Sequence, residues 1–310
     1  MTSPRRVEPP TLSPGATVGF VGLGNMGGPM VARLTRAGYA VRGFDVSEDA
    51  REAVGEQTGA TIVHAVTEVA QGAEGVVLML PNSKIVRAVL LDEGLLDALA
   101  PGSLLVDMSS SAPTDTRAIA PDVAERGVHF VDAPVSGGVK GAREGTLTIV
   151  VGGEEADVEA ARPMLEVIGK RALHVGGTGA GHALKALNNL LSAATLIATS
   201  EAIEAGKRFG LDPAVMIDAI NTSSGRSYST EYKFPSFVLP ETYDAGFDIS
   251  LMVKDIACAL ELARSTGSPS QVTEVVVERW RRAAEDLPAG SDHTAIARWI
   301  QERAERDPAV

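Results

Sequence analysis

Three glycines that follow a short apolar run constrain the fold of this 310-residue chain more than any other feature. Residues 16–21 are apolar and of strand type, and Gly22, Gly24 and Gly27 come directly after them. A helical stretch over residues 29–37 follows. In such an order the first glycine makes a tight turn, the second lets a pyrophosphate approach the backbone, and the third lets helix pack on strand. The pattern predicts a dinucleotide site at the helix N-terminus.

An acidic residue ends the next strand. Residues 39–44 form a second strand-type run, and Asp45 follows it. We expect its carboxylate to accept hydrogen bonds from the ribose diol of the cofactor. A 2′-phosphate would face that charge, and the next residues, Val46 and Ser47, offer no guanidinium. The sequence therefore favours NAD over NADP, while an ordinary doubly wound domain with a glycine turn is the alternative.

The first half continues with alternating strands and helices. Strand and helix pairs are expected over residues 61–71, 75–91 and 103–126. A strand over residues 128–131 follows, and then a hairpin-like pair, residues 145–151 and 171–175, around a helix over residues 154–168. This alternation predicts a parallel sheet of Rossmann type.

Candidate binding residues follow several of these strands. Leu80-Pro81-Asn82 and Asp107-Met108-Ser109-Ser110 should face the cofactor, because ligands bind at the carboxyl ends of parallel strands. The serines at 109–111 could equally cap the following helix. Ser136, Gly137 and Gly138 offer one hydroxyl and free backbone amides, which suit a small carboxylate.

Residues 183–208 predict one long helix of about 40 Å. Lys185 and Asn189 share one side of it, and the other sides are apolar, so we expect a buried helix. A buried ammonium needs a reason, although a solvated first turn is the alternative. Asn188 and Glu201 interrupt the apolar run too early for a membrane span.

The remainder predicts an all-α domain. Helices are expected over residues 212–221, 250–265, 270–285 and 293–304, with a long polar loop over residues 223–247. Lys254 and Asp255 fall early in the second of these helices, where a surface ion pair is the alternative to a functional role.

Charge and composition exclude several classes of function. A formal charge of −12 argues against a broad nucleic-acid or anionic-membrane surface. Cys258 is the only cysteine, which fits a reducing, cytoplasmic compartment. The five histidines have no metal-ligand spacing, so no metal site is expected.

Four motifs in order resemble the β-hydroxyacid dehydrogenases. They are the glycine loop at 22–27, Asp-Ala-Pro-Val-Ser-Gly-Gly at 132–138, Gly-Thr-Gly-Ala-Gly at 177–181 continuing through Lys185 to Asn189, and Leu-Met-Val-Lys-Asp at 251–255. Within that family, the Ser-Ser-Gly-Arg-Ser-Tyr-Ser stretch at 223–229 is most similar to the 3-hydroxyisobutyrate dehydrogenases, and those enzymes tend to have Trp where Tyr228 stands. Tyr228 is therefore expected near the substrate.

The resemblance implies a role for each candidate residue. Lys185 would be catalytic, and Asn189 would orient the substrate. The substrate would be bound by Ser136, Gly137, Gly138, Asn189, Tyr228 and Lys254. The cofactor would be bound by Gly22, Leu23, Gly24, Asn25, Met26, Gly27, Asp45, Leu80, Pro81, Ser110 and Lys254.

The resemblance also implies an architecture and a reaction. We expect a Rossmann-type domain over residues 16–178, an interdomain helix over 179–209 and a helical domain to residue 310, in a homodimer or homotetramer. The expected reaction moves a hydride between NAD and a small 3-hydroxy acid or its semialdehyde. Related activities on L-serine, tartronate semialdehyde, threonate or sulfolactaldehyde stay open, as do an imine reductase and a noncatalytic binding module.

Overall fold

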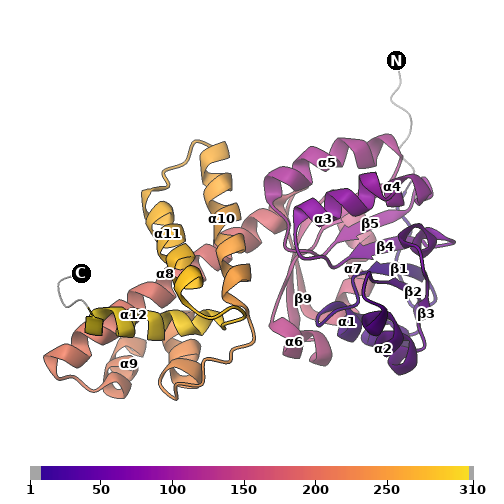
Figure 1. The fold of residues 1–310 in the computed structure, drawn as a ribbon. Helices are drawn as coiled ribbons and strands as arrows, with labels where there is room; N and C mark the ends of the chain where they lie inside the picture. The colour runs from indigo at the N-terminus through magenta and orange to yellow at the C-terminus, as the bar shows by residue number, and fades with distance from the viewer. Residues whose placement is uncertain (1–7, 307–310) are drawn as a thin grey trace. The chain divides into compact units, whose positions relative to one another are not determined.

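The computed structural model describes residues 8–306, which divide into two compact units with the boundary between Lys185 and Ala186. The first unit is built on a nine-stranded sheet (Figure 1). Its strands are β1 (Thr17–Val21), β2 (Ala40–Phe44), β3 (Thr61–Ile62), β4 (Gly75–Leu78), β5 (Leu104–Asp107), β6 (His129–Asp132), β7 (Val135–Ser136), β8 (Leu147–Gly153) and β9 (Gly169–Gly176).

The strand order is β3-β2-β1-β4-β5-β6-β8-β7, with β9 beside β8. Strands β1 to β6 pair in parallel, as alternating strands and helices predict. The expected hairpin-like pair is wrong, because β8 and β9 are parallel. Helix α7 (Glu155–Ile168) between them carries the chain back along the sheet, so the second strand re-enters in the same direction as the first. Strand β8 is antiparallel to β6 and β7.

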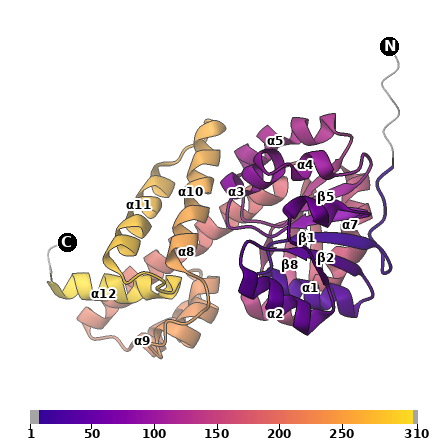
Figure 2. The same ribbon diagram turned by 45° about the vertical axis from the view of Figure 1, so that its right-hand side comes forward.

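Helices cover both faces of this sheet (Figure 2). Val77 packs on one face, and its neighbours Val76 and Leu78 pack on the other. Strands buried on both sides are apolar at successive positions, which explains the continuous apolar runs in the sequence. One layer contains α1 (Gly27–Arg36), α2 (Glu48–Thr58), α6 (Gly138–Glu144) and α7; the other contains η1 (Val66–Ala70), α3 (Ser83–Arg87), η2 (Ala88–Asp92), α4 (Leu95–Ala98) and α5 (Pro113–Glu125).

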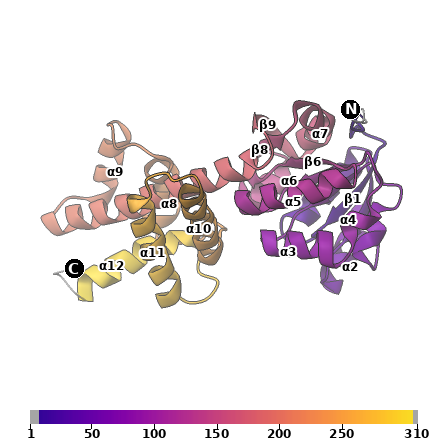
Figure 3. The same cartoon turned by 90° about the horizontal axis from the view of Figure 1, so that it is seen from above.

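The long helix α8 (Ala180–Phe209) is continuous over 30 residues, and helices follow it in the second unit (Figure 3). These are α9 (Pro213–Asn221), η3 (Ser229–Val238), α10 (Ile249–Ser265), α11 (Gln271–Asp286), η4 (His293–Ala295) and α12 (Ile296–Arg306). Trp280 and Trp299, 0% and 3% exposed, lie in the core of this unit. The expected all-α architecture is confirmed, since the β-type pairing recorded here is one isolated bridge.

Two expectations for this half need correction. Residues 223–247 are not a simple loop, because they contain the ten-residue η3 with Pro235 inside it. Its wide π-type turns accommodate a residue that breaks an α-helix. The long helix is also not buried all round, because Leu184, Leu187 and Leu191 are 41%, 40% and 65% exposed. Among the described helices, none has the length and apolar character needed to cross a membrane.

Candidate active site

The glycine loop between β1 and α1 leaves a backbone surface open to a ligand. Gly22 has φ +98°, and a Cβ there would lie 2.2 Å from the Met79 carbonyl oxygen. A Cβ on Gly27 would lie 1.8 Å from the Gly22 carbonyl oxygen, so both positions require glycine. A Cβ on Gly24, by contrast, would meet nothing within 4 Å. With no side-chain cap from Met26, the first turn of α1 keeps backbone amides for an anion, so the loop fits a pyrophosphate.

Asp45 closes this loop from the end of β2. Its Oδ2 accepts a hydrogen bond from the Leu23 amide at 2.7 Å, and its Oδ1 accepts one from the Ser47 amide at 2.8 Å. Each carboxylate oxygen has a further lone pair, so the group can also accept from a ribose diol. Sequence reasoning missed Arg51, whose Nη1 donates to the Asp45 carbonyl oxygen at 2.6 Å from one turn into α2.

The ends of β4 and β5 are joined by Ser109. Its Oγ accepts a hydrogen bond from the Leu80 amide at 2.9 Å, and its side chain is fully buried. Ser111 donates to Asp107 Oδ2 at 3.0 Å, while Ala112 stands at the N-cap of α5 with no side-chain cap. Ser109 therefore joins the ends of two strands, Ser111 bonds back to the last residue of β5, and neither caps the helix. This arrangement holds the segment after Leu80 in place.

A lysine and a serine meet in the first unit. Lys185 Nζ, in the second turn of α8, donates a hydrogen bond to Ser136 Oγ at 2.8 Å. Ser136 is the last residue of β7, and Gly137 and Gly138 after it are exposed with φ +131° and +61°. A Cβ on Gly138 would meet nothing within 4 Å, so there is open space beside this residue. The pair combines a cation, a hydroxyl and open backbone amides, which is the chemistry that binds a small carboxylate.

Asp132 fixes where this lysine lies. Its Oδ1 accepts a hydrogen bond from the Gly179 amide at 2.7 Å, and its Oδ2 accepts one from the His182 amide at 2.8 Å. The carboxylate is fully buried and caps the N-terminus of α8. A Cβ on Gly152 or Gly181 would lie under 3 Å from Asp132 side-chain oxygens, so glycine at these two positions leaves room for the Asp132 carboxylate. Sequence reasoning noted the Asp132 motif but missed this role.

His182 secures the same turn of α8. Its Nε2 donates to the Ser109 carbonyl oxygen at 3.0 Å, because a carbonyl can only accept, and its Nδ1 lies 2.8 Å from Thr116 Oγ1. The ring is buried. His182 therefore links α8 to α5 and to the segment after β5, and both of its ring nitrogens have partners within the protein.

The second unit holds the other candidate residues. Asn189 Nδ2 donates to Asp255 Oδ2 at 2.6 Å, and Lys254 Nζ lies 3.1 Å from Asp255 Oδ1. Asp255 is 4% exposed, so this is not a surface ion pair. The buried carboxylate orients the Asn189 amide, a role that its place beside Lys254 in the sequence did not reveal. Tyr228 is 61% exposed, and its ring packs 5.2 Å from that of Tyr232; its proximity to a substrate stays a prediction.

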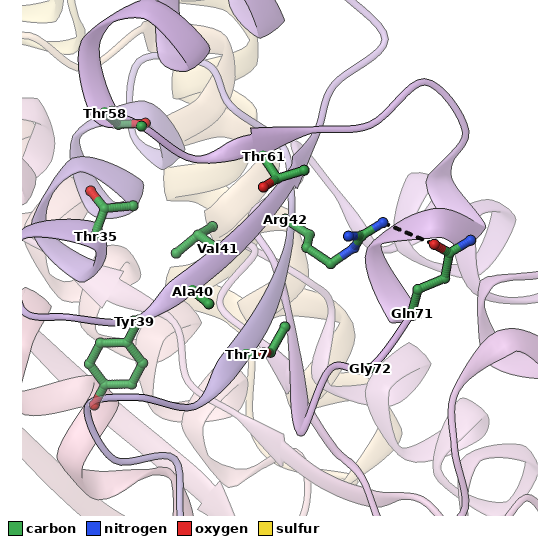
Figure 4. A pocket seen from close by; sticks show the side chains of 11 residues that line it. Thr17, Thr35, Tyr39, Ala40, Val41, Arg42, Thr58, Thr61, Gln71 and Gly72 are labelled. Atoms are coloured by element: carbon green, nitrogen blue, oxygen red, sulfur yellow. Dashed lines mark hydrogen bonds between the residues drawn. The ribbon is translucent and has the colours of Figure 1, made fainter.

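A hollow of about 490 Å³ lies elsewhere in the first unit (Figure 4). Thr17, Ala40 and Thr61, the first residues of β1, β2 and β3, contribute to its lining, so it lies at the amino ends of the strands. Arg42, the cation in it, donates to Gln71 Oε1 and to a backbone carbonyl, both at 3.0 Å. The glycine loop and Ser136 follow the carboxyl ends of strands, and the hollow is therefore not part of this site.

Comparisons with known proteins agree with this geometry. Residues 17–177 match the family model described as the NAD binding domain of 6-phosphogluconate dehydrogenase, and residues 179–300 match that described as NAD-binding of NADP-dependent 3-hydroxyisobutyrate dehydrogenase. The chain is 42% identical to 2-(hydroxymethyl)glutarate dehydrogenase from Eubacterium barkeri over 84% of this chain and 87% of that protein. It is 36% identical to NAD-dependent L-serine dehydrogenase from Pseudomonas aeruginosa over 90% and 96%.

A solved structure shows the same fold. The Mycobacterium tuberculosis 3-hydroxyisobutyrate dehydrogenase with L-serine superimposes with a TM-score of 0.88 at 32% identity, over 92% of this chain and 99% of that one. The expected Rossmann-type domain, helical domain and NAD cofactor are confirmed. The chain belongs to the β-hydroxyacid dehydrogenase family of NAD-binding oxidoreductases, whose members act on the CH–OH group of hydroxy acids.

Proposed function

We propose that this enzyme transfers a hydride between NAD and the hydroxyl-bearing carbon of a small 3-hydroxy acid such as 3-hydroxyisobutyrate, with Lys185 as the proton donor and acceptor. The 2.8 Å hydrogen bond from Lys185 Nζ to Ser136 Oγ carries this proposal. If Ser136, Gly137 and Gly138 hold the substrate carboxylate, the hydroxyl on the carbon two bonds from the carboxylate carbon comes within reach of the same amine. Proton transfer requires that proximity.

Each remaining residue has a supporting task. The nicotinamide, when bound, supplies the hydride acceptor. The glycine loop holds the pyrophosphate, Asp45 accepts from the ribose diol, and Leu80, Pro81, Ser110 and Lys254 border the cofactor. Asn189, oriented by Asp255, holds the substrate while Lys185 takes the hydroxyl proton in oxidation and returns it in reduction.

The test measures NADH formation from 3-hydroxyisobutyrate. Lys185→Ala should lower turnover by about 10² to 10⁴, because general acid–base catalysis contributes that much. NADH binding, followed by fluorescence, should persist. Lys207→Ala is the matched control, since Lys207 lies on the same helix and pairs with Glu204 at the surface. Unchanged turnover in Lys185→Ala overturns the proposed role.

Other members of the family provide the second candidates. L-serine is favoured among them, because one relative is named an L-serine dehydrogenase. A panel of L-serine, tartronate semialdehyde, threonate and sulfolactaldehyde ranks these substrates by kcat/KM. Reduction of a cyclic imine instead identifies an imine reductase, and no turnover with any of them identifies a binding module.

We infer that the enzyme works as a homodimer or homotetramer in the cytoplasm. Leu184, Leu187 and Leu191 expose an apolar face of α8 in the single chain, and burial against a second copy would remove it from water. Cys258 is the single cysteine of the chain, so no intrachain disulfide can form, which is compatible with a reducing compartment.

A further inference from the structure

Arg51 lies at the strand end that carries the proposed ribose contact, and the proposed function gives it no part. It belongs to α2, and its Nη1 donates hydrogen bonds to the Asp45 carbonyl oxygen at 2.6 Å and to the Val46 carbonyl oxygen at 3.4 Å. Side chains on a helix lean toward its N-terminus, which brings this guanidinium back over the end of β2. The cation therefore lies at the backbone of the residue whose carboxylate is proposed to bind the ribose diol.

No protein carboxylate neutralises this guanidinium. Within residues 8–306, Arg51 forms no ion pair with an acidic side chain. Glu48 lies three residues earlier on the same helix, the spacing of a helical ion pair, but the guanidinium turns to the strand end instead. The Asp45 carboxylate is itself engaged, because its two oxygens accept from the Leu23 and Ser47 amides. The positive charge of Arg51 therefore remains for another anion.

Arg51 also has hydrogen-bond donors left, and solvent reaches it. A guanidinium has five N–H bonds, and in the described part of the chain Arg51 donates only from Nη1. Its side chain is partly exposed, and its neighbours Val46 and Ser47 are exposed, Val46 to 86%. A ligand that extends from the glycine loop toward Asp45 can therefore reach the guanidinium without displacing any core side chain.

We propose that Arg51 is a cofactor-specificity residue, which attracts a 2′-phosphate on the adenosine ribose and so opposes the repulsion of that phosphate by Asp45. This rests on the proposed contact between Asp45 and the ribose diol. A 2′-phosphate replaces one of the two hydroxyls of that diol, so it enters beside the same residue that the guanidinium contacts. Glu48, Asp49 and Glu52, all exposed on α2, act against an anion. One cation among these acids reduces the preference for NAD without reversing it.

A purely structural role of Arg51 would act on every cofactor alike. If Arg51 only ties α2 to the end of β2, its loss loosens the Asp45 segment, and the affinities for ribose with and without a phosphate fall together. Attraction to the 2′-phosphate changes one affinity more than the other. The fragments 5′-AMP and 2′,5′-ADP differ in that phosphate alone. They bind without any chemical step, so the comparison does not depend on Lys185 or on a substrate.

The test measures the dissociation constants of 5′-AMP and 2′,5′-ADP by titration calorimetry at low ionic strength. Arg51→Met should weaken 2′,5′-ADP relative to 5′-AMP by about 3- to 10-fold, the range of one charge-assisted contact at a partly exposed site. Arg51→Lys keeps the charge but not the planar fork, so it should show a smaller loss. Arg36→Met is the matched control, since Arg36 is exposed in the last turn of α1, and it should leave both constants unchanged.

A second pair of variants separates Arg51 from Asp45. Asp45→Ser removes the repulsion and should raise the affinity for 2′,5′-ADP relative to 5′-AMP. The double variant Asp45→Ser/Arg51→Met should lose about 3- to 10-fold of that relative affinity again. NADPH and NADH, titrated by fluorescence, should follow the same order. Added salt should reduce the effect of Arg51, because it screens a partly exposed charge pair.

The outcomes separate this inference from the proposed function. An Arg51→Met variant that keeps the wild-type ratio of the two dissociation constants overturns the role of Arg51, whether both constants rise together or neither changes. The proposed function then stands, because hydride transfer with NAD does not require this residue. A wild type that binds neither NADH nor NADPH refutes the cofactor site at Asp45, and the proposed function fails together with this inference.

Discussion

Replacing Lys233 by methionine should make the protein more stable at neutral pH. The pKa of this lysine falls from 10.5 to about 8 on folding, because burial penalises the ammonium. This lowering of the pKa corresponds to about 3 kcal/mol of destabilisation at pH 7. The lost hydrogen bond to Ser192 offsets about 1 kcal/mol of the gain. A methionine of similar length should thus raise the free energy of unfolding by about 2 kcal/mol.

The pH dependence of the free energy of unfolding tests the sign of this effect independently. Between pH 8 and 10.5 the unfolded chain binds a proton at this position that the folded chain does not, so wild-type stability should rise with pH through that range. Below pH 8 both states are protonated, and the penalty is present in full. Lys233→Met should remove the rise, so the two stability curves converge at high pH.

Urea unfolding followed by tryptophan fluorescence is the appropriate assay. Trp280 and Trp299 both lie in the core of the unit that contains Lys233, so the signal reports that unit. Lys207→Met, at an exposed site, should change stability by less than about 0.5 kcal/mol. A Lys233→Met variant that is less stable than the wild type at pH 7, or that shows the same rise with pH, refutes the reasoning.

Three more outcomes are expected. The wild type should have a higher kcat/KM with NAD than with NADP, because the Asp45 carboxylate, which is proposed to bind the ribose diol, would repel a 2′-phosphate; equal or better use of NADP contradicts this. Asp132→Asn should lower stability by about 3 kcal/mol and reduce turnover, because the Gly179 and His182 amides donate to different side-chain oxygens and the NH2 group of asparagine cannot accept in place of one of them. Asp218→Asn, at an exposed position, is the control, and equal melting of the two variants disproves the role of Asp132. Light scattering at micromolar concentration should give at least twice the 32.2 kDa chain mass, and a fully active monomer rules out the oligomer.

Local patterns were sufficient for the glycine loop and the long helix. The G-x-G-x-x-G spacing and the unbroken run of helix formers are properties of neighbouring residues, and the structure contains both elements where the sequence predicts them. The direction of β9 was predicted wrongly because its apolar pattern is the same in a parallel and an antiparallel pair. The η3 helix was missed because Pro235 indicates a break in any α-helical pattern.

The hydrogen bonds that the sequence could not predict join residues that are far apart in the chain. Asp132 meets His182 across 50 residues, Asn189 meets Asp255 across 66, and Lys233 meets Ser192 across 41. No periodicity connects such pairs. A strand-end aspartate followed later by a Gly-x-Gly-x-Gly helix start could have indicated the Asp132 clamp, whereas a lysine inside a polar loop gives no indication that it is buried.

Because α8 is one continuous helix, substitutions in it and changes in its length should have different consequences. Each residue in an α-helix advances the chain by 1.5 Å and turns it by about 100°. Deleting or adding one residue between Lys185 and Asn189 would turn Asn189 by about 100° away from the side of the helix that carries Lys185, while Asp132 still holds the first turn. Substitutions along this segment can therefore accumulate singly, but a change in its length would separate the proposed proton donor, Lys185, from Asn189, which is proposed to orient the substrate. Length variation among descendants of this chain should be confined to its loops.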